Sequence, residues 1–198
     1  MSPVVQLVKL KTGDLKMSEK PSSNIVVKMA DVRLSFPAVF EPVAFDEGAT
    51  PKYSATFRMN KTEHAKEVKE IQKAVATLLS EHKVKTLSPD RICLKDGADT
   101  GREEDEDFYI IKASNNKRPL VLNKDRTPLT ERDGVLYPGC RVNAILSLWF
   151  QDHPKFGKRV NASLSGLMFN RDDQPFGSMG ASADDFADFS SDDEDTAF

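Results

Sequence analysis

The chain has 198 residues, of which 39% are hydrophobic and 30% are charged. This length predicts one domain with tails, and the low hydrophobic fraction indicates that part of the chain lacks a packed core. Cys93 and Cys140 stand far apart in the sequence, which argues against a disulfide framework or a Cys-rich zinc site. No apolar run approaches the roughly 20 residues of a membrane helix, and the N-terminus does not resemble a secretory signal. We therefore expect a protein of the reducing cytoplasm without a membrane partner.

Charge is divided unevenly along the chain. From Asp172 onward there are nine acidic residues and no Lys or Arg, which leaves 22 acidic and 28 basic residues before it, a net charge of +6. A basic body with an acidic tail is a polarity that binders of single-stranded nucleic acid often need. A tail that only keeps an ordinary domain soluble gives the same pattern.

The N-terminal part of the expected domain begins with a strand over Ile25 to Phe36. Its alternation breaks near Ala30–Asp31, which indicates a bulge or bend, and Pro37 is expected to end it. The loop expected around it carries Phe36, Phe40 and Phe45 between prolines and Gly48. It either folds as a lid on the core or presents its rings to a ligand.

Lys52 to Met59 alternates between polar and apolar residues and predicts a second strand. Lys52 and Arg58 lie on its polar face and are candidate phosphate contacts, although an ordinary solvated face explains them equally well. Asn60 and Glu63 then form a plausible capping box for a helix. Apolar residues recur at helical spacing from there to His82.

Seven acidic residues fall between Asp96 and Asp107. A calcium loop favours Asp, Asn or Ser at its third and fifth positions, where Ala98 and Thr100 stand, so we expect a solvated, mobile loop. A strand over 108–113 follows it. The strand and the basic turn after it add three candidate nucleic-acid contacts, Lys112, Lys117 and Arg118.

The longest strand pattern is a hairpin over 139–170. Its two apolar faces coincide only if paired residue numbers add to an even number, because a slip of one residue moves every side chain to the other face. This register is expected to place Arg141, Trp149 and Arg159 together on the outer face. An exposed Trp beside cations is a platform for stacking a base, whereas a Trp packed under another segment is equally compatible with the pattern.

Catalytic motifs are missing from the sequence. There is no phosphate-binding loop with Lys and no Gly-x-Ser-x-Gly, and His64, His82 and His153 stand in unrelated contexts. We therefore predict neither a metal nor another cofactor, and we do not expect an enzyme. Two other classes stay open: a metal-dependent DNA-processing enzyme that uses the acidic loop, and a protein-interaction module without a nucleic-acid role.

Five stretches in the same order resemble tailed-phage single-stranded DNA-binding proteins: RLSFPAVFEP, PKYSATFRMNK, NKRPLVLNKD, LYPGCRVNAILSLWF and FGKRVNASLSGLMFNRDDQPFG. The resemblance implies a mostly β, α+β fold with one long helix, an OB-fold-like, partly open antiparallel barrel. It implies sequence-tolerant binding of single-stranded DNA in phage replication or recombination, in the cytoplasm of a bacterial host. It also adds Arg33, Tyr53, Lys155, Phe156 and Lys158 to the candidate contacts.

The expected organisation is a flexible leader over 1–23, the DNA-binding domain over 24–171 and a disordered acidic tail over 172–198. The acidic tail that ends in Phe resembles those of other replication proteins that bind single strands, which implies that it recruits replication or recombination proteins or competes with DNA. The residues that would do so here are Asp192, Asp193, Glu194, Asp195 and Phe198. The assembly is open between a monomer and a homodimer.

Overall fold

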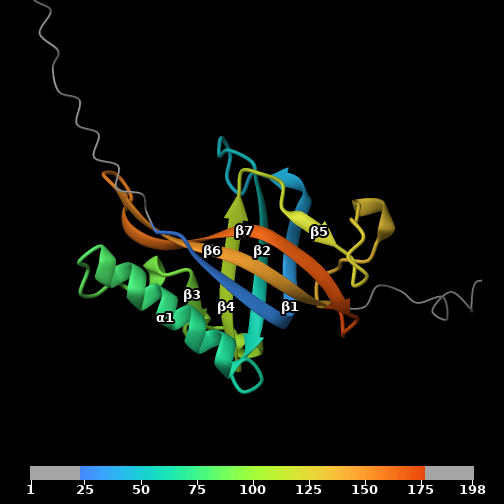
Figure 1. The fold of residues 1–198 in the computed structure, drawn as a ribbon, viewed down its shortest axis with the longest axis horizontal. Helices are drawn as coiled ribbons and strands as arrows, with labels where there is room; N and C mark the ends of the chain where they lie inside the picture. The colour runs from blue at the N-terminus through green and yellow to red at the C-terminus, as the bar shows by residue number, and fades with distance from the viewer. Residues whose placement is uncertain (1–22, 177–198) are drawn as a thin grey trace, which may run out of the picture.

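A computed structural model describes residues 23–176. One seven-stranded sheet with the order β3-β4-β2-β1-β6-β7-β5 forms most of it (Figure 1). Its neighbouring strands are antiparallel except for β5 and β7, which are parallel. The elements are β1 (Ile25–Val43), β2 (Lys52–Asn60), α1 (Ala65–Glu81), β3 (Leu94–Asp96), β4 (Phe108–Asn115), β5 (Leu120–Leu122), β6 (Arg141–His153) and β7 (Gly157–Arg171), with short 3-10 helices at Pro89–Arg91, Gly97–Thr100, Glu103–Asp105 and Glu131–Asp133.

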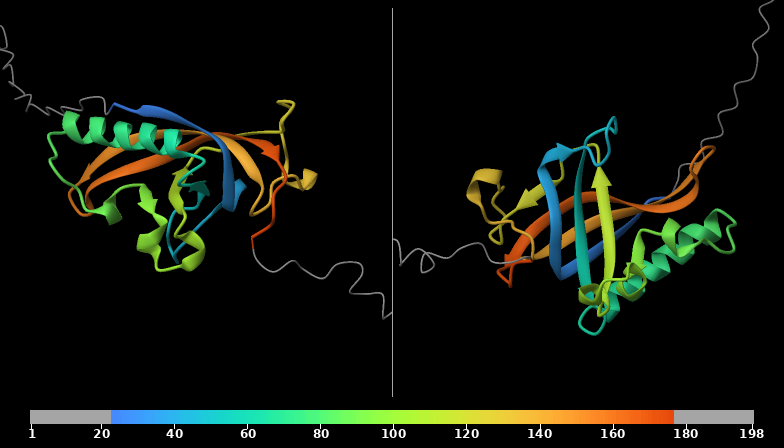
Figure 2. Two further views of the ribbon diagram at one scale, coloured as in Figure 1. Left: turned by 90° about the horizontal axis from the view of Figure 1, so that it is seen from below. Right: turned by 180° about the vertical axis from the view of Figure 1, so that it is seen from behind.

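The sheet curls until its two ends approach each other (Figure 2). Ile92, just before β3, forms a parallel bridge with Val160 of β7, and the Cys93 amide donates to the Val160 carbonyl at 2.9 Å. The side-chain amide of Asn115 at the end of β4 donates to the Leu164 carbonyl of β7 at 3.0 Å. The result is the expected OB-fold-like, partly open barrel with one helix.

The first strand is longer than its sequence predicts. It continues through Pro37 to Val43. The prediction that Pro37 ends the strand is therefore wrong. The proline sits where the register with β2 shifts between Ser35 and Ala38, and irregular pairing is where a strand tolerates a residue without an amide hydrogen. The expected irregularity at Asp31 is confirmed, since this residue has a φ of 54° and the register with β6 shifts beside it.

The helix α1 packs against β1 and β6 and lies along one side of the curled sheet (Figures 1 and 2). Its buried residues follow the expected helical spacing: Val68, Ile71, Ala74, Val75 and Leu78. The Asn60 carboxamide accepts from the backbone amides of Thr62 and Glu63, but this bond closes a turn before the helix, which begins at Ala65. Among residues 23–176, no helix is long and apolar enough to cross a membrane.

The register of the β6–β7 hairpin determines which side chains enter the core. From Leu146 opposite Leu164 to His153 opposite Gly157, paired residue numbers add to an even number, as predicted. Leu148 and Phe150 consequently lie in the core, while Trp149 faces outward. A shift between Ile145 and Leu146 changes the register over the rest of the hairpin.

The acidic segment is more ordered than predicted, because part of it is buried. Asp105 is only 2% exposed, and its carboxylate lies 2.9 Å from the guanidinium of Arg58, which also faces Glu104 at 3.4 Å. Gly97 has room for no side chain, since an added Cβ would lie 1.7 Å from the Asp105 carbonyl oxygen. The expectation of a wholly solvated, mobile loop is therefore wrong for Gly97 and Asp105.

Replacing Asp105 by asparagine should lower the free energy of unfolding by about 3 kcal/mol, because it leaves the nearly buried Arg58 without its closest carboxylate. Urea unfolding followed by circular dichroism measures this loss. Glu106→Gln changes an exposed acid in the same segment and should have almost no effect. Equal stability of the two variants would show that the buried ion pair does not stabilise the segment.

Candidate nucleic-acid interface

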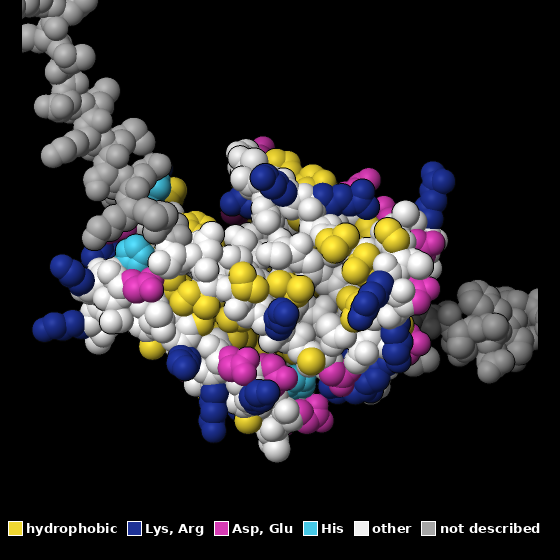
Figure 3. Space-filling model, in the orientation of Figure 1, with side chains coloured by type: hydrophobic (Ala, Val, Ile, Leu, Met, Phe, Trp, Pro, Cys, Tyr) yellow, Lys and Arg dark blue, Asp and Glu magenta, His cyan; other side chains and the backbone are white. Residues whose placement is uncertain are grey.

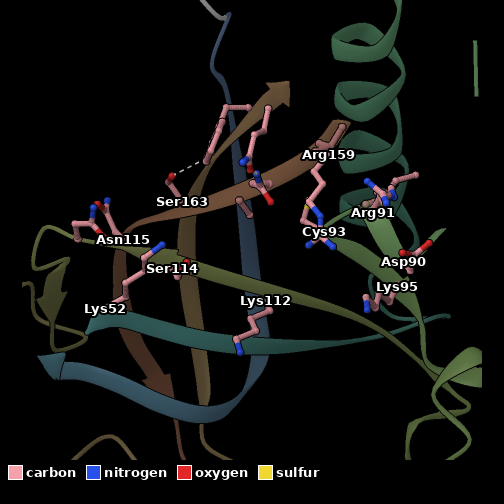
Figure 4. A pocket seen from close by; sticks show the side chains of 17 residues that line it. Lys52, Asp90, Arg91, Cys93, Lys95, Lys112, Ser114, Asn115, Arg159 and Ser163 are labelled. Carbon is pink, nitrogen blue, oxygen red and sulfur yellow. Dashed lines mark hydrogen bonds between the residues drawn. The ribbon is translucent and has the colours of Figure 1, made fainter. Parts of the chain in front are cut away.

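A cleft of about 470 Å³ opens on the outer surface where β4 approaches β7 (Figure 4). Its lining comes from the β6–β7 hairpin, from β2 and β4, and from the segment that leads into β3. The lining residues are Lys52, Asp90, Arg91, Ile92, Cys93, Lys95, Lys112, Ser114, Asn115, Asn116, Trp149, Gln151, Arg159, Val160, Asn161, Ala162 and Ser163. Four of the predicted contacts therefore meet in one place, namely Lys52, Lys112, Trp149 and Arg159.

The floor of the cleft is the outward face of β6 and β7. Trp149 is half-buried there, and its indole nitrogen donates to the Ser163 hydroxyl at 3.0 Å. Beside it, the side-chain amide nitrogen of Asn161 donates to the side-chain oxygen of Gln151 at 2.7 Å. These bonds fix the orientation of the indole and of one amide pair, so the floor is aromatic and polar at once. The helix packs on the opposite, apolar face of β6, where His82 stacks on Phe150.

The rim of the cleft is strongly basic. Five lining residues are Lys or Arg, and Asp90 is the one acidic residue that accompanies them. Lys52, Lys112 and Arg159 were expected from the sequence, whereas Arg91 and Lys95 were not. The bridge between Ile92 and Val160 brings Arg91 and Lys95 to the cleft, and this long-range contact leaves no local signal in the sequence.

The lining also contains Cys93, whose thiol is chemically quiet. Burial raises the pKa of Cys93 to about 11, so the thiol is neutral at pH 7. It is also free of any disulfide.

Exposed aromatic rings flank the cleft. Phe45, in the loop after β1, lies with its ring 3.8 Å from the Lys112 ammonium, a cation–π contact. Phe156 at the hairpin turn is 56% exposed, and its carbonyl accepts a hydrogen bond from Arg91 at 3.0 Å.

Phe36 is 69% exposed but lies outside the cleft, in a separate hollow that Arg58 and Arg102 also line. The two alternatives for this aromatic segment therefore divide between its residues: Phe40 packs against the core, whereas Phe36 and Phe45 expose their rings.

A second basic group, made of Arg33, Arg58 and Arg141, lies outside this lining. Each of its arginines already pairs with a carboxylate of the chain. The Arg141 guanidinium contacts the carboxylates of Asp173 at 2.6 Å, Glu63 at 3.2 Å and Asp31 at 3.4 Å. The expected grouping of Arg141 with Trp149 is wrong, because eight residues along a strand separate them by about 26 Å. A shared face along a strand does not make two residues neighbours.

Residues 172–176, which we call the strap, lie over this second group. The Phe176 ring stacks on the guanidinium groups of Arg33 at 4.1 Å and Arg58 at 4.5 Å. The Phe176 amide donates to the Pro138 carbonyl at 2.9 Å, and the Tyr137 hydroxyl donates to the Asp172 carboxylate at 3.0 Å. The start of the acidic tail thus covers Arg33 and Arg58, two arginines that were predicted to contact DNA.

Ion pairs shift the pKa values of two carboxyl groups beneath and within the strap. The hydrogen bond from Arg141 lowers the pKa of Asp173 below its ordinary value. Burial alone would raise the pKa of Asp31, but hydrogen bonds from Arg171 and Asn170 outweigh it and leave that pKa lowered. Both groups are therefore anionic partners of arginine at neutral pH.

The remaining predicted contacts are distributed around the cleft. Tyr53 is half-buried in β2, Lys117 and Arg118 are exposed after β4, and Lys155 and Lys158 are exposed at the hairpin turn. Their roles in DNA binding stay predictions. The predicted partner-binding residues Asp192, Asp193, Glu194, Asp195 and Phe198 lie outside the described residues.

The curled sheet, the single helix and the basic, aromatic cleft define an OB-fold-like protein. A sequence model of the family described as "Enterobacter phage Enc34, ssDNA-binding protein" matches residues 25–197. The chain belongs to this family.

Individual relatives agree with this assignment. The putative protein p50 of Acyrthosiphon pisum secondary endosymbiont phage 1 is 34% identical over 175 residues, which cover 83% of this chain and 94% of that protein. The structure of the single-stranded DNA-binding protein from bacteriophage Enc34 in complex with ssDNA is 33% identical with a TM-score of 0.71, over 77% of this chain and 89% of that one. The bacteriophage T7 single-stranded DNA-binding protein gp2.5 is 14% identical with a TM-score of 0.52, over 89% of this chain and 100% of that one, a likeness of fold alone.

The strap should respond to acid through Asp173. Because its folded pKa lies below the unfolded value of about 3.9, its contribution to stability is complete above that pH and is lost as the pH falls through the folded pKa. Asp173→Asn should therefore be less stable than the parent at pH 7, and the difference should shrink as the pH falls below about 3.9. Urea unfolding across this range measures it, with Asp99→Asn as an exposed control. A difference that does not change with pH would contradict the ion pair.

Proposed function

We propose that this protein binds single-stranded DNA in the cleft, with little preference for sequence, and serves phage DNA replication or recombination in a bacterial host cytoplasm. One observation carries the proposal: the outward-facing Trp149 and five basic side chains line a single cleft. The membership in the Enc34 family supports it, and so does the complex of the Enc34 protein with ssDNA.

In this proposal the basic side chains contact phosphates and the aromatic side chains stack on bases. Lys52, Lys112 and Arg159 neutralise phosphates and release counterions, so affinity falls as salt rises. Trp149 stacks a base, which is worth about 1–3 kcal/mol and works for every base because each has a π-face. Phe45 and Phe156, exposed beside the cleft, provide further rings on which bases of the DNA strand can stack.

The arginines under the strap have a conditional role in this proposal. Arg33, Arg58 and Arg141 already pair with carboxylates, so DNA reaches them only by replacing those partners. Lys117, Arg118 and Lys155 are exposed and can track the DNA backbone outside the cleft, as can Lys158, which lies 3.9 Å from the Asp152 carboxylate. The cleft is therefore the primary site.

Binding without catalysis is the activity that we propose. The most buried carboxylate of the acidic segment, Asp105, is held by Arg58. Within residues 23–176, no three His, Cys, Asp or Glu side chains gather as metal ligands. Labelled DNA that stays intact with the protein in magnesium or manganese supports this choice, and its cleavage overturns it.

Trp149→Ala should weaken binding of a single-stranded oligonucleotide about 5- to 150-fold, the loss of one stacked base. Anisotropy of a labelled oligonucleotide measures the affinity of both proteins. Lys69→Ala removes a positive charge from the exposed face of α1 and should leave the affinity nearly unchanged. Quenching of the single tryptophan in the parent gives an independent readout. Equal affinity of the parent for duplex and single strands would reject the proposed function.

Beyond DNA, we propose that the acidic tail recruits replication or recombination proteins and competes with DNA for the basic body. Its composition supports this, since seven acidic residues and no Lys or Arg follow Phe176. A homodimer joined through the exposed apolar side chains Val26, Leu120 and Ile145 belongs to the same proposal, and light scattering tests it.

Deleting residues 177–198 keeps the strap and removes most of the acidic tail. The shortened protein should bind single-stranded DNA more tightly, with the largest gain at low salt, because an internal anionic competitor is lost. Titrations at two salt concentrations measure the gain. A full-length variant with Asp192, Asp193, Glu194 and Asp195 changed to their amides is the matched control for charge alone. Affinity that is unchanged in both proteins would reject competition by the tail.

A further inference from the structure

Two amide side chains lie beside the indole on the floor of the cleft. Trp149 and Asn161 are directly opposite each other on β6 and β7, and Gln151 is two residues along β6 on the same face. Directly opposite side chains in an antiparallel pair have Cβ atoms about 4.5–5.5 Å apart. A base stacked on Trp149 therefore has one edge within reach of these amides.

The amides are fixed before any ligand arrives. The bond from Asn161 to Gln151, 2.7 Å long, uses one donor and one acceptor of the pair. It leaves the Gln151 amide nitrogen and the Asn161 carbonyl oxygen without another protein hydrogen bond among the described residues. If both side-chain amides were flipped, so that oxygen and nitrogen exchanged places, one free donor group and one free acceptor would still face the cleft. The pair thus offers a donor next to an acceptor.

This pairing of a donor with a neighbouring acceptor is complementary to a feature that all four bases share. Each base carries a donor and an acceptor side by side on its Watson–Crick edge, and proteins read unstacked bases through that edge. In a duplex the same edge is occupied by the partner base. A donor beside an acceptor therefore distinguishes unpaired from paired bases, and it does so without selecting one base.

We infer that Gln151 and Asn161 read the Watson–Crick edge of an unpaired base stacked on Trp149, and so make the cleft selective for single strands. The inference rests on the proposed binding of single-stranded DNA in this cleft. It assigns to the two amides a task that neither stacking nor phosphate neutralisation performs, because duplex ends also offer π-faces and every duplex offers phosphates.

The test compares a short oligothymidylate with the same oligonucleotide carrying N3-methylthymine at every position. The methyl group removes the N3 donor but keeps the phosphates and the stacking ring. The parent protein should bind the methylated strand about tenfold more weakly, toward the lower end of what a bidentate base contact provides. Equal affinity for the two strands would overturn the inference.

A variant separates hydrogen bonding from a steric effect of the methyl group. Gln151→Met with Asn161→Leu removes the amides at similar volume, and both positions are only half-buried, so the fold should survive. This variant should bind both strands equally and lose about tenfold in its preference for single strands over duplex. Gln72→Leu removes an exposed amide of α1, outside the cleft, and should keep the discrimination of the parent. A methyl effect that persists in the double variant would also overturn the inference.

The two proposals fail in different ways. Absence of binding to unmodified oligothymidylate at low salt rejects DNA binding itself. Tight binding that ignores the N3-methyl group rejects only the reading of the base edge.

Discussion

The even register of the β6–β7 hairpin is the constraint on which both the core and the cleft depend. It places Leu148 and Phe150 in the interior and Trp149, Gln151 and Asn161 outside. A slip of one residue would exchange the two sets and expose the apolar side chains. The hydrophobic free energy that holds the core therefore also aims the indole and the amides at the cleft, so the functional face needs no separate source of stability.

The basic side chains beneath the strap and those of the cleft differ in their electrostatic surroundings. Arg33, Arg58 and Arg141 pair with carboxylates of the chain itself, whereas Arg159 and the lysines of the cleft face solvent with a single acid nearby. The first group ties the acidic segment and the strap to the body. The second leaves positive charge uncompensated where the aromatic floor lies. Figure 3 shows Lys and Arg distributed around a face whose middle carries hydrophobic side chains over β6 and β7.

Local periodicity predicted the parts of the fold that depend on local sequence. The face of α1 and the pairing of Leu146 with Leu164 followed from spacing alone. The same reasoning failed where distant segments meet. Nothing near Arg91 indicates that Ile92 will bridge Val160, and no pattern in the acidic segment distinguishes the buried Asp105 from its exposed neighbours.

The candidate site was accordingly predicted in its floor and in part of its rim. Trp149, Arg159, Lys52 and Lys112 were identifiable, because each lies on the polar face of a strand. Arg141 was misplaced, since the sequence gives parity along a strand but not distance across the sheet. The strap escaped prediction because its contacts depend on Arg33 and Arg58, far earlier in the chain.

The strap also sets the point from which the rest of the chain is tethered. Phe176 is held against Arg33, Arg58 and the Pro138 carbonyl, so this residue has a fixed place on the body. For a linked segment, encounter with its own body depends on an effective concentration that linker length and anchor position determine. Loosening the strap would lengthen that tether by five residues without changing a single charge. If the tail competes with DNA as proposed, a contact of a few side chains would set how often this anionic segment meets the basic surface.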